Sequence, residues 1–322
     1  MPSVRAKYEA EGYSKHVIDM LMKGWRNNTQ KQYNVYLNKW NLFCIKKKWC
    51  PQERNIKHCV DFLLHLYNSK NSYSAINTAR SALSCIFDVP PIGEHSVIKR
   101  FMRSVFNTRP SKPRYTKIWD VSIVLKYLER KSPARNLNLQ ELTMKLLMLC
   151  ALVTAQRCQT LQALNLKDCE IRLTKVVFNI QTLLKHNRPT NNNNTIVLPS
   201  YVNNKNLCVV TYLKAYIKRT KPFRKDNQLF LSYVVPHKPV SKETISRWLK
   251  LTLQKAGVNT QIFKAHSTRA AATSAVQKDL DVTVIMKAAG WSNARTFATY
   301  YKKRVDEDKK TTTFGKAVLG KR

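Results

Sequence analysis

Apolar residues recur at every third or fourth position along most of this chain, and this period predicts a mainly helical fold. In the first third of the chain the pattern spans residues 29–44, 55–70, 72–87 and 96–106. Thr29 precedes the first of these runs and is expected to cap its helix. Only seven glycines occur in the whole sequence, so few positions favour a break. We therefore predict a small all-helical domain over residues 1–106.

A short basic stretch interrupts the helical pattern at residues 107–118. It begins NTRPSKPRYTK, with two prolines, four basic residues and few apolar ones. This composition is typical of an exposed linker. The stretch is either a plain solvated connection or a basic strap that lies against a polyanion, and the charge of the whole chain favours the strap.

The remaining residues, 119–322, are expected to form a second domain. Two β-like runs at 175–184 and 195–199 flank the turn-rich stretch KHNRPTNNNN, which is the pattern of a β-hairpin. Helical patterns lie on both sides of it, at residues 121–131, 138–153, 208–218, 241–256, 268–278 and 281–288. We predict a mixed but mostly α domain with one small β-hairpin.

The chain carries a formal net charge of +38 on 322 residues, and this charge indicates what kind of partner it binds. Residues 1–110 contribute +11 and residues 111–322 contribute +27, so both predicted domains are basic. A charge this large favours a polyanionic partner, while a hydrophobic content of 43% excludes a disordered basic tail. We expect both domains to be attracted to a phosphate backbone, with counterion release supplying much of the affinity.

The cysteine pattern and the apolar runs predict an intracellular protein without a membrane span. The eight cysteines form no CxxC pair and no zinc-finger spacing with histidine, so we expect reduced thiols and no structural metal. The N-terminal sequence lacks the apolar core of a signal peptide, and no apolar run reaches the ~18 residues of a membrane span. In a eukaryotic host we expect the protein in the nucleus.

The motifs of several enzyme classes are missing from the sequence. No glycine-rich phosphate loop and no HExxH motif occur, and acidic residues are too scarce in the second domain for a two-metal nuclease. The run AHSTRAAATSAV instead places His266 three residues before Arg269, near the expected start of a helix. Further along, Trp291 follows Gly290, and a pair of tyrosines closes the segment.

The order and spacing of these motifs resemble those of the tyrosine recombinase (integrase) family. In this chain HxxR is followed after 21 residues by a Gly-Trp pair, and a tyrosine stands nine or ten residues after the tryptophan. Upstream, VTAQRCQTLQALNL resembles the first arginine motif of the family and contains Arg157. The run LLKHNRP resembles its lysine-bearing β-turn and contains Lys185.

An N-terminal pattern formed by Thr29, Tyr33, Trp40 and Phe43 extends the resemblance to nearly the whole chain. The resemblance implies a helical, SAM-like core-binding domain followed by a recombinase catalytic domain, together forming a C-shaped clamp around DNA. It also implies a homotetramer on DNA, assembled from two dimers, and no cofactor. The wording of the motifs, such as QRCQTL, HSTR and AGWSN, is closest to recombinases of eukaryotic mobile elements of the DIRS, Ngaro and Crypton kinds.

The resemblance implies a metal-independent reaction in which a tyrosine hydroxyl attacks the scissile phosphate and a 3′-phosphotyrosyl link forms. Arg157 and Arg269 would hold the non-bridging oxygens while negative charge builds up in the transition state. Lys185 would protonate the leaving 5′-oxygen from the tip of the hairpin. Lys175 is a weaker candidate for this role, because it begins the strand.

The remaining implied roles leave one choice open. His266 would assist proton transfer or hydrogen-bond a phosphate oxygen, and Trp291 would donate its indole N–H to the phosphate. Tyr300 stands nine residues after Trp291 and Tyr301 stands ten. Successive helix residues point about 100° apart, so only one of them can face the phosphate, and the eukaryotic relatives favour Tyr301. Thr160 stands where many members have an acid.

We therefore predict a site-specific DNA recombinase or integrase that serves the integration or excision of a mobile element. One alternative is a domesticated descendant that binds DNA as a regulator without cleaving it. Another is an enzyme of the type IB topoisomerase kind, which shares the chemistry. The complete set of motif residues counts against the first alternative, and the compact helical N-terminal domain counts against the second.

Overall fold

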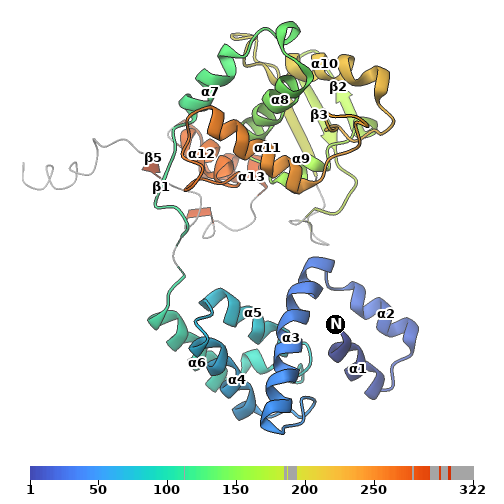
Figure 1. The fold of residues 1–322 in the computed structure, drawn as a ribbon, viewed down its shortest axis with the longest axis vertical. Helices are drawn as coiled ribbons and strands as arrows, with labels where there is room; N and C mark the ends of the chain where they lie inside the picture. The colour runs from blue at the N-terminus through green and yellow to red at the C-terminus, as the bar shows by residue number, and fades with distance from the viewer. Residues whose placement is uncertain are drawn as a thin grey trace, which may run out of the picture. The chain divides into compact units, whose positions relative to one another are not determined.

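The computed structural model describes residues 1–111, 113–184, 187, 194–277, 279–290, 297–298 and the backbone of 304–305. The chain is mostly helical, as its periodicity predicts, and it divides into two compact units, residues 1–112 and 113–322 (Figure 1). The domain limits set from the sequence, 1–106, 107–118 and 119–322, stay predictions. Among the described helices, none is both long and apolar enough to cross a bilayer.

Helices alone build the described part of the first unit. They are α1 (Pro2–Ala10), α2 (Lys15–Lys23), α3 (Asn27–Lys47), α4 (Ile56–Asn68), α5 (Tyr73–Leu83) and α6 (Ser96–Thr108), with a short 3-10 helix at Ile92–Glu94. One buried core joins them. Within it the ring of Trp40 lies edge-on to those of Phe62 and Phe87, with centroids 5.4 and 6.1 Å away. Asn55 and Ser72 cap α4 and α5 through their side chains.

The start of α3 differs from the sequence prediction. The helix begins at Asn27 with Arg26 as its N-cap, so Thr29 lies inside the first turn and its predicted capping role was wrong. The apolar period that located this helix is absent from its polar first turn, NNTQ, and therefore could not mark the boundary. The helices α1 and α2 were not predicted.

The second unit is built around the long helix α8. Its helices are α7 (Val121–Arg130), α8 (Leu139–Thr154), α9 (Cys158–Gln162), α10 (Val209–Thr220), α11 (Lys242–Lys255), α12 (Ser267–Ala275) and α13 (Val282–Ala289). Every residue of α8 from Leu142 to Ala151 is buried, so this stretch has no solvent face. In Figure 1, α8 lies among the other helices and beside the sheet.

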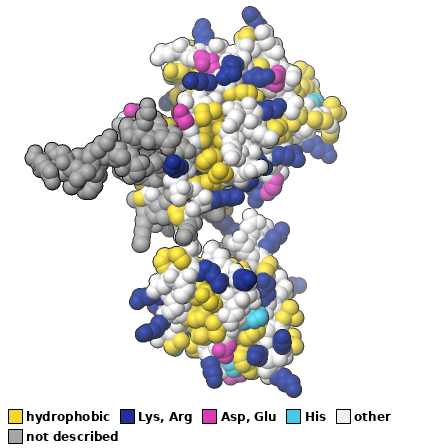
Figure 2. Space-filling model, turned by 60° about the vertical axis from the view of Figure 1, so that its left-hand side comes forward, with side chains coloured by type: hydrophobic (Ala, Val, Ile, Leu, Met, Phe, Trp, Pro, Cys, Tyr) yellow, Lys and Arg dark blue, Asp and Glu magenta, His cyan; other side chains and the backbone are white. Residues whose placement is uncertain are grey.

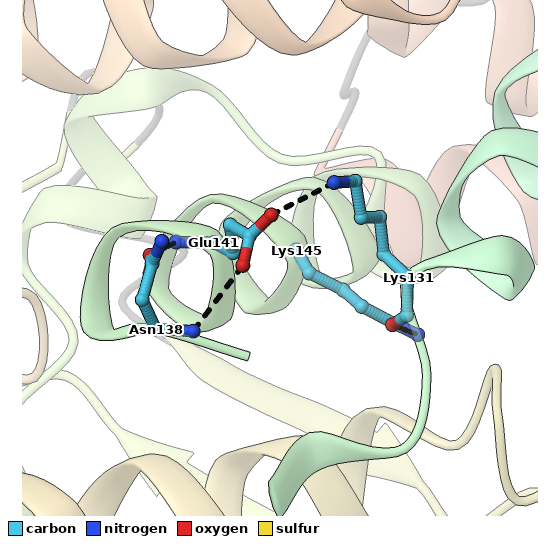
Figure 3. Close-up of polar contacts among 4 residues, drawn as sticks. All are labelled: Lys131, Asn138, Glu141 and Lys145. Atoms are coloured by element: carbon cyan, nitrogen blue, oxygen red, sulfur yellow. Dashed lines mark hydrogen bonds and ion pairs between the residues drawn. The ribbon is translucent and has the colours of Figure 1, made fainter. Parts of the chain in front are cut away.

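A capping box begins α8 (Figure 3). Asn138 Oδ1 accepts a hydrogen bond from the backbone N–H of Glu141 at 2.8 Å, and Glu141 Oε2 accepts one from the backbone N–H of Asn138 at 3.2 Å. Glu141 Oε1 also pairs with Lys131 Nζ at 2.7 Å, and this contact lowers the pKa of Glu141. The pair ties the end of α7 to the start of α8.

Lys145 is buried within α8, with only 2% of its surface exposed. Its Nζ donates to the carbonyl oxygens of Leu128 and Lys131, both at 2.7 Å, and to Ser132 Oγ at 2.8 Å. It also lies 3.8 Å from the centre of the Tyr212 ring. The side chain thus serves as a cap for the C-terminal end of α7, where a positive charge is favoured by the helix dipole. Burial lowers the pKa of Lys145 to about 7.

An antiparallel sheet of three strands lies beside the helices. Its order is β2 (Cys169–Ile171), β3 (Lys175–Asn179) and β4 (Thr195–Pro199), and Val177 is paired with Val197. The predicted hairpin is confirmed in β3 and β4. The predicted run 175–184 was too long, because strand pairing stops at Asn179, and β2 was not predicted.

A second, smaller pairing joins two segments that are far apart in the sequence. The strand β1 (Lys117–Ile118) runs parallel to β5 (Arg304–Val305), with Lys117 opposite Arg304 and Ile118 opposite Val305. Ile118 is fully buried. This pairing places the backbone that follows the candidate tyrosines beside the first strand of the second unit.

Candidate active site

Arg157 stands at the junction between α8 and α9. It is the N-cap residue of α9 and has an extended backbone, with φ −75° and ψ 153°. Two residues earlier, Ala155 ends α8 in the left-handed conformation with φ 48°. The chain therefore changes direction immediately before Arg157, whose side chain is half-buried.

The guanidinium of Arg157 has unused hydrogen-bonding capacity. Its Nη1 is buried and has no hydrogen-bond partner among the described residues. None of the ion pairs in that part of the chain involves Arg157. Buried N–H groups are nearly always paired in native proteins. A buried and positively charged donor of this kind is suited to an external anion, which would complete its hydrogen bonds.

Arg269 lies in the first turns of α12 and is 2% exposed. Its Nη1 donates to the carbonyl oxygen of Ala155, and its Nη2 donates to that of Ala289 at 3.1 Å. The first contact brings the HxxR motif to the residue that lies two positions before Arg157. The structure therefore brings the two arginine motifs together at the end of α8.

His266 is the N-cap residue of α12 and is exposed. It stands three positions before Arg269, as the motif requires, but the two side chains differ sharply in burial. A buried hydrogen bond fixes the start of this helix: Trp119 Nε1 donates to Ser267 Oγ at 2.9 Å. This anchor fixes the backbone next to His266 while leaving the imidazole at the surface.

Gln156 makes a further contact at the site, which the sequence did not predict. Gln156 is 5% exposed, and its Nε2 donates to the carbonyl oxygen of Ala288 at 2.9 Å. Its Oε1 is buried without a hydrogen-bond partner in the described part of the chain. No residue pattern distinguishes this glutamine from the others, because its partner is a backbone carbonyl 132 positions away.

A small apolar cluster supports the same region. It consists of Ala155, Ala272, Ile285, Ala289 and Phe297, all buried. The alanines let α12, α13 and the end of α8 approach closely, and the Phe297 side chain is 1% exposed. The segment after α13 is thus anchored at Phe297.

Four predicted site residues lie outside the described residues: Lys185, Trp291, Tyr300 and Tyr301. Their described neighbours do have defined places. Leu184 and Asn187 exchange two hydrogen bonds, from Asn187 N to Leu184 O at 3.0 Å and from Leu184 N to Asn187 Oδ1 at 2.9 Å. Gly290 ends α13 with φ 69°, a left-handed conformation that glycine adopts readily.

The other candidates near the site are described. Lys175 begins β3, as the sequence indicates. Thr160, at the position where many relatives have an acid, is 2% exposed within α9. Burial raises the pKa of the neighbouring Cys158 thiol, so this group is uncharged near neutral pH. The positive charge of Arg157 is therefore not offset by these two α9 side chains.

The surface outside the site is strongly basic. Figure 2 shows Lys and Arg side chains distributed over the visible face of both units, with few acidic side chains among them. This distribution agrees with the positive charge of both halves of the sequence. Each unit can therefore attract a polyanion by itself.

Comparisons with known proteins give a consistent picture. The sequence matches the phage integrase family model over residues 124–307. A structure of the Tn1549 transposon integrase in complex with transposon right-end DNA has a TM-score of 0.61 at 13% identity, covering 92% of this chain and 94% of that chain. The XerH site-specific recombinase bound to a palindromic difH substrate has a TM-score of 0.60 at 15% identity, covering 90% and 77%.

A lambda integrase dimer bound to a COC′ core site has a TM-score of 0.56 at 16% identity, covering 95% of this chain and 78% of that chain. At these identities the likeness shows the fold, and it is the fold that the sequence motifs predict. Comparison with curated proteins gave no match.

Proposed function

Because the chain belongs to the phage integrase family, we propose that it cleaves and rejoins DNA at specific sites through a covalent phosphotyrosyl intermediate. The observation that carries this proposal is the meeting of the two arginine motifs at the end of α8. Arg269 binds the carbonyl oxygen of Ala155, and the buried Nη1 of Arg157 is without a partner among the described residues. A scissile phosphate is an anion that would satisfy this donor.

The two arginines have distinct parts in the proposed reaction. Arg157 offers unused N–H groups and would bind the non-bridging oxygens directly. Arg269 donates from both Nη atoms to backbone carbonyls, so its guanidinium is held rigidly while its charge acts on the phosphate. Donors fixed in advance stabilise the charge that develops in the transition state without reorganising during the reaction.

The other motif residues complete the chemistry. Lys185 would donate the proton that the leaving 5′-oxygen needs. His266, which is exposed at the start of α12, would assist proton transfer or donate to a phosphate oxygen. Trp291 would donate its indole N–H. Tyr301 is the preferred nucleophile and Tyr300 its alternative, standing four and three residues after the buried Phe297.

The substrate is double-stranded DNA, whose phosphates each of the two basic units would contact, with the basic stretch 107–118 as a further strap against the DNA. A tetramer assembled from two dimers would carry out strand exchange. The biological role is the integration or excision of a mobile element, in the nucleus if the host is a eukaryote. Support comes from the fold shared with a transposon integrase solved on transposon-end DNA.

A nicked suicide substrate tests this function. The protein is incubated, without added metal, with DNA that carries the terminal sequence of its own element, and covalent protein–DNA adducts are separated on a denaturing gel. We expect an adduct with the wild type, and we expect Tyr301→Phe to abolish it while Tyr300→Phe retains it. The reverse result would assign the nucleophile to Tyr300. Adducts that persist in both variants would contradict both assignments.

The same assay addresses the two alternatives. A regulator that has lost catalysis would bind this DNA and give no adduct. A topoisomerase-like enzyme would relax supercoiled plasmids of arbitrary sequence, whereas a site-specific recombinase needs its own site. The unpartnered donor on Arg157 favours an active enzyme over a silent descendant.

A further inference from the structure

We propose that Gln156 is a positioning residue for DNA cleavage: it fixes the end of α13 against the α8–α9 junction and thereby places the following segment relative to Arg157. This inference rests on the proposed recombinase activity. Gln156 need not touch the DNA. It would act through the backbone of Ala288.

The contact is buried and specific. Gln156 is 5% exposed, and its Nε2 lies 2.9 Å from the carbonyl oxygen of Ala288, in the last turn of α13. Carbonyls in the last turn of a helix lack partners within the helix. A side-chain donor from the α8–α9 junction satisfies this one. Because the junction also carries Arg157 as the next residue, the contact links the end of α13 to the phosphate-binding arginine.

Gln156 shares this task with Arg269, which donates to the adjacent carbonyl of Ala289 at 3.1 Å. The two side chains hold consecutive carbonyls, but only one of them is charged. The charge of Arg269 would attract a phosphate in the site while both Nη atoms keep their carbonyl partners. The amide of Gln156 carries no charge, so we expect its hydrogen bond to Ala288 to be the same with and without bound DNA.

The segment after α13 carries three proposed site residues. Gly290 ends the helix and directly precedes Trp291, and the candidate nucleophiles Tyr300 and Tyr301 follow Phe297. We therefore expect a shift of the end of α13 to change how the residues that follow it are presented to Arg157. A displacement of ~1 Å in an active site can slow the reaction by about 100-fold.

Gln156→Met tests the inference, because methionine has a similar length but cannot donate to Ala288. Gln228→Met is the control: the side chain of Gln228 is half-buried, and its Nε2 also donates to a backbone carbonyl, that of Val240 at 3.0 Å. Single-turnover adduct formation, DNA affinity and the melting temperature are measured for both, with rates taken well below the melting temperature of each variant.

We expect adduct formation in Gln156→Met to slow by ~10- to 100-fold, with DNA affinity close to that of the wild type, and no such slowing in the control. A substrate with a 5′-bridging sulfur separates this effect from a loss of general acid. The C–S–P linkage releases a thiolate that needs no proton, so it should restore a Lys185→Ala variant. It should not restore Gln156→Met, since the defect there is in the position of the attacking tyrosine.

Gln156→Asn is a second variant, in which the donor is present but one methylene too short to reach Ala288. If either Gln156 variant folds and cleaves at the wild-type rate, the inference is wrong. Rescue of Gln156→Met by the sulfur substrate would overturn it as well. A wild type that gives no adduct on its own site would instead contradict the proposed function itself.

Discussion

Arg269 donates a buried hydrogen bond from Nη1 to the carbonyl oxygen of Ala155, a residue 114 positions earlier in the chain. Arg157 follows two residues after this carbonyl. The guanidinium of one motif therefore positions the backbone that carries the other, and neither arginine can shift without affecting the other. Substitutions at this point should separate binding of DNA from the chemistry performed on it.

Replacement of Arg157 should impair cleavage far more than binding. In Arg157→Ala we expect adduct formation on the suicide substrate to fall by about 10²- to 10³-fold, the usual effect of removing one oxyanion donor. DNA affinity should change little, because the proposed phosphate contacts are shared among many other basic residues. Adduct yield over time and a binding titration at the same salt concentration measure the two effects.

A DNA substrate whose scissile linkage alone is uncharged provides the control for this prediction. A methylphosphonate at the scissile position removes one non-bridging charge, so it reduces the need for a positive partner. The ratio between wild-type and Arg157→Ala rates should shrink on this substrate. An unchanged ratio would mean that Arg157 acts on folding or binding instead of on the developing charge.

The left-handed backbone at Ala155 should be visible in the free energy of unfolding. A non-glycine residue in this conformation is disfavoured by roughly 1–2 kcal/mol, a cost that glycine avoids. Ala155→Gly loses a buried methyl, worth about 0.8 kcal/mol, but relieves this strain, so we expect a nearly neutral effect. Urea unfolding monitored by circular dichroism gives the value.

Ala151→Gly on the same helix is the matched control. Ala151 is buried like Ala155 but lies in the interior of α8, where glycine has no conformational advantage. It should destabilise the protein more than Ala155→Gly does, by a difference of about 1–2 kcal/mol. Equal effects at the two positions would contradict the assigned backbone strain.

Two variants of the hairpin region test whether Lys185 or Lys175 is the general acid. Lys185→Ala should slow cleavage of normal DNA by about 10²- to 10⁴-fold, as expected for loss of a general acid, and should recover on the 5′-bridging sulfur substrate. Lys175→Ala, at the start of β3, should have little effect on either substrate. If Lys175→Ala instead shows the defect and the recovery, the general acid is Lys175.

Lys145 should make stability depend on pH. Burial lowers the pKa of Lys145 to about 7 in the folded protein, whereas an unburied lysine has a pKa of 10.5. Between these values the unfolded chain binds more protons than the folded one, so the contribution of Lys145 to stability increases as pH rises from about 7 towards 10 and is lost as pH falls through 7. Lys145→Met lacks this titration.

The difference in unfolding free energy between wild type and Lys145→Met should therefore grow with pH over this range. Urea titrations of both proteins at several pH values measure it, and other titrating groups cancel in the comparison. A difference that does not vary with pH would show that the folded protein keeps Lys145 charged.

The sequence predicted those parts of the fold that have a long, repeated pattern. Helices such as α7 and α11 fall within a residue or two of their predicted limits, because their apolar faces recur over several turns. The strand β2 has only three residues, too few to show alternation. The first turn of α3 is polar, which is why its start was misplaced.

The candidate site is a similar case. Arg157 and Arg269 could be proposed from the sequence because they belong to motifs with recognisable spacing, and in the structure Arg269 contacts the carbonyl oxygen of Ala155, two residues before Arg157. The contact of Gln156 was not predicted, because its partner is a backbone carbonyl and every residue has one, so no residue type marks the position. The left-handed conformation of Ala155 was missed for a related reason: glycine or asparagine would have marked such a position, and alanine does not.

The parallel pairing of β1 with β5 has a mechanical consequence. Residues 117–118, where the basic stretch ends, are hydrogen-bonded in register with residues 304–305, which follow the candidate tyrosines by a few positions. The chain that enters the second unit and the chain that leaves the tyrosine segment therefore share one pair of strands. A displacement of the chain at residues 117–118 would therefore be passed through this pairing to residues 304–305.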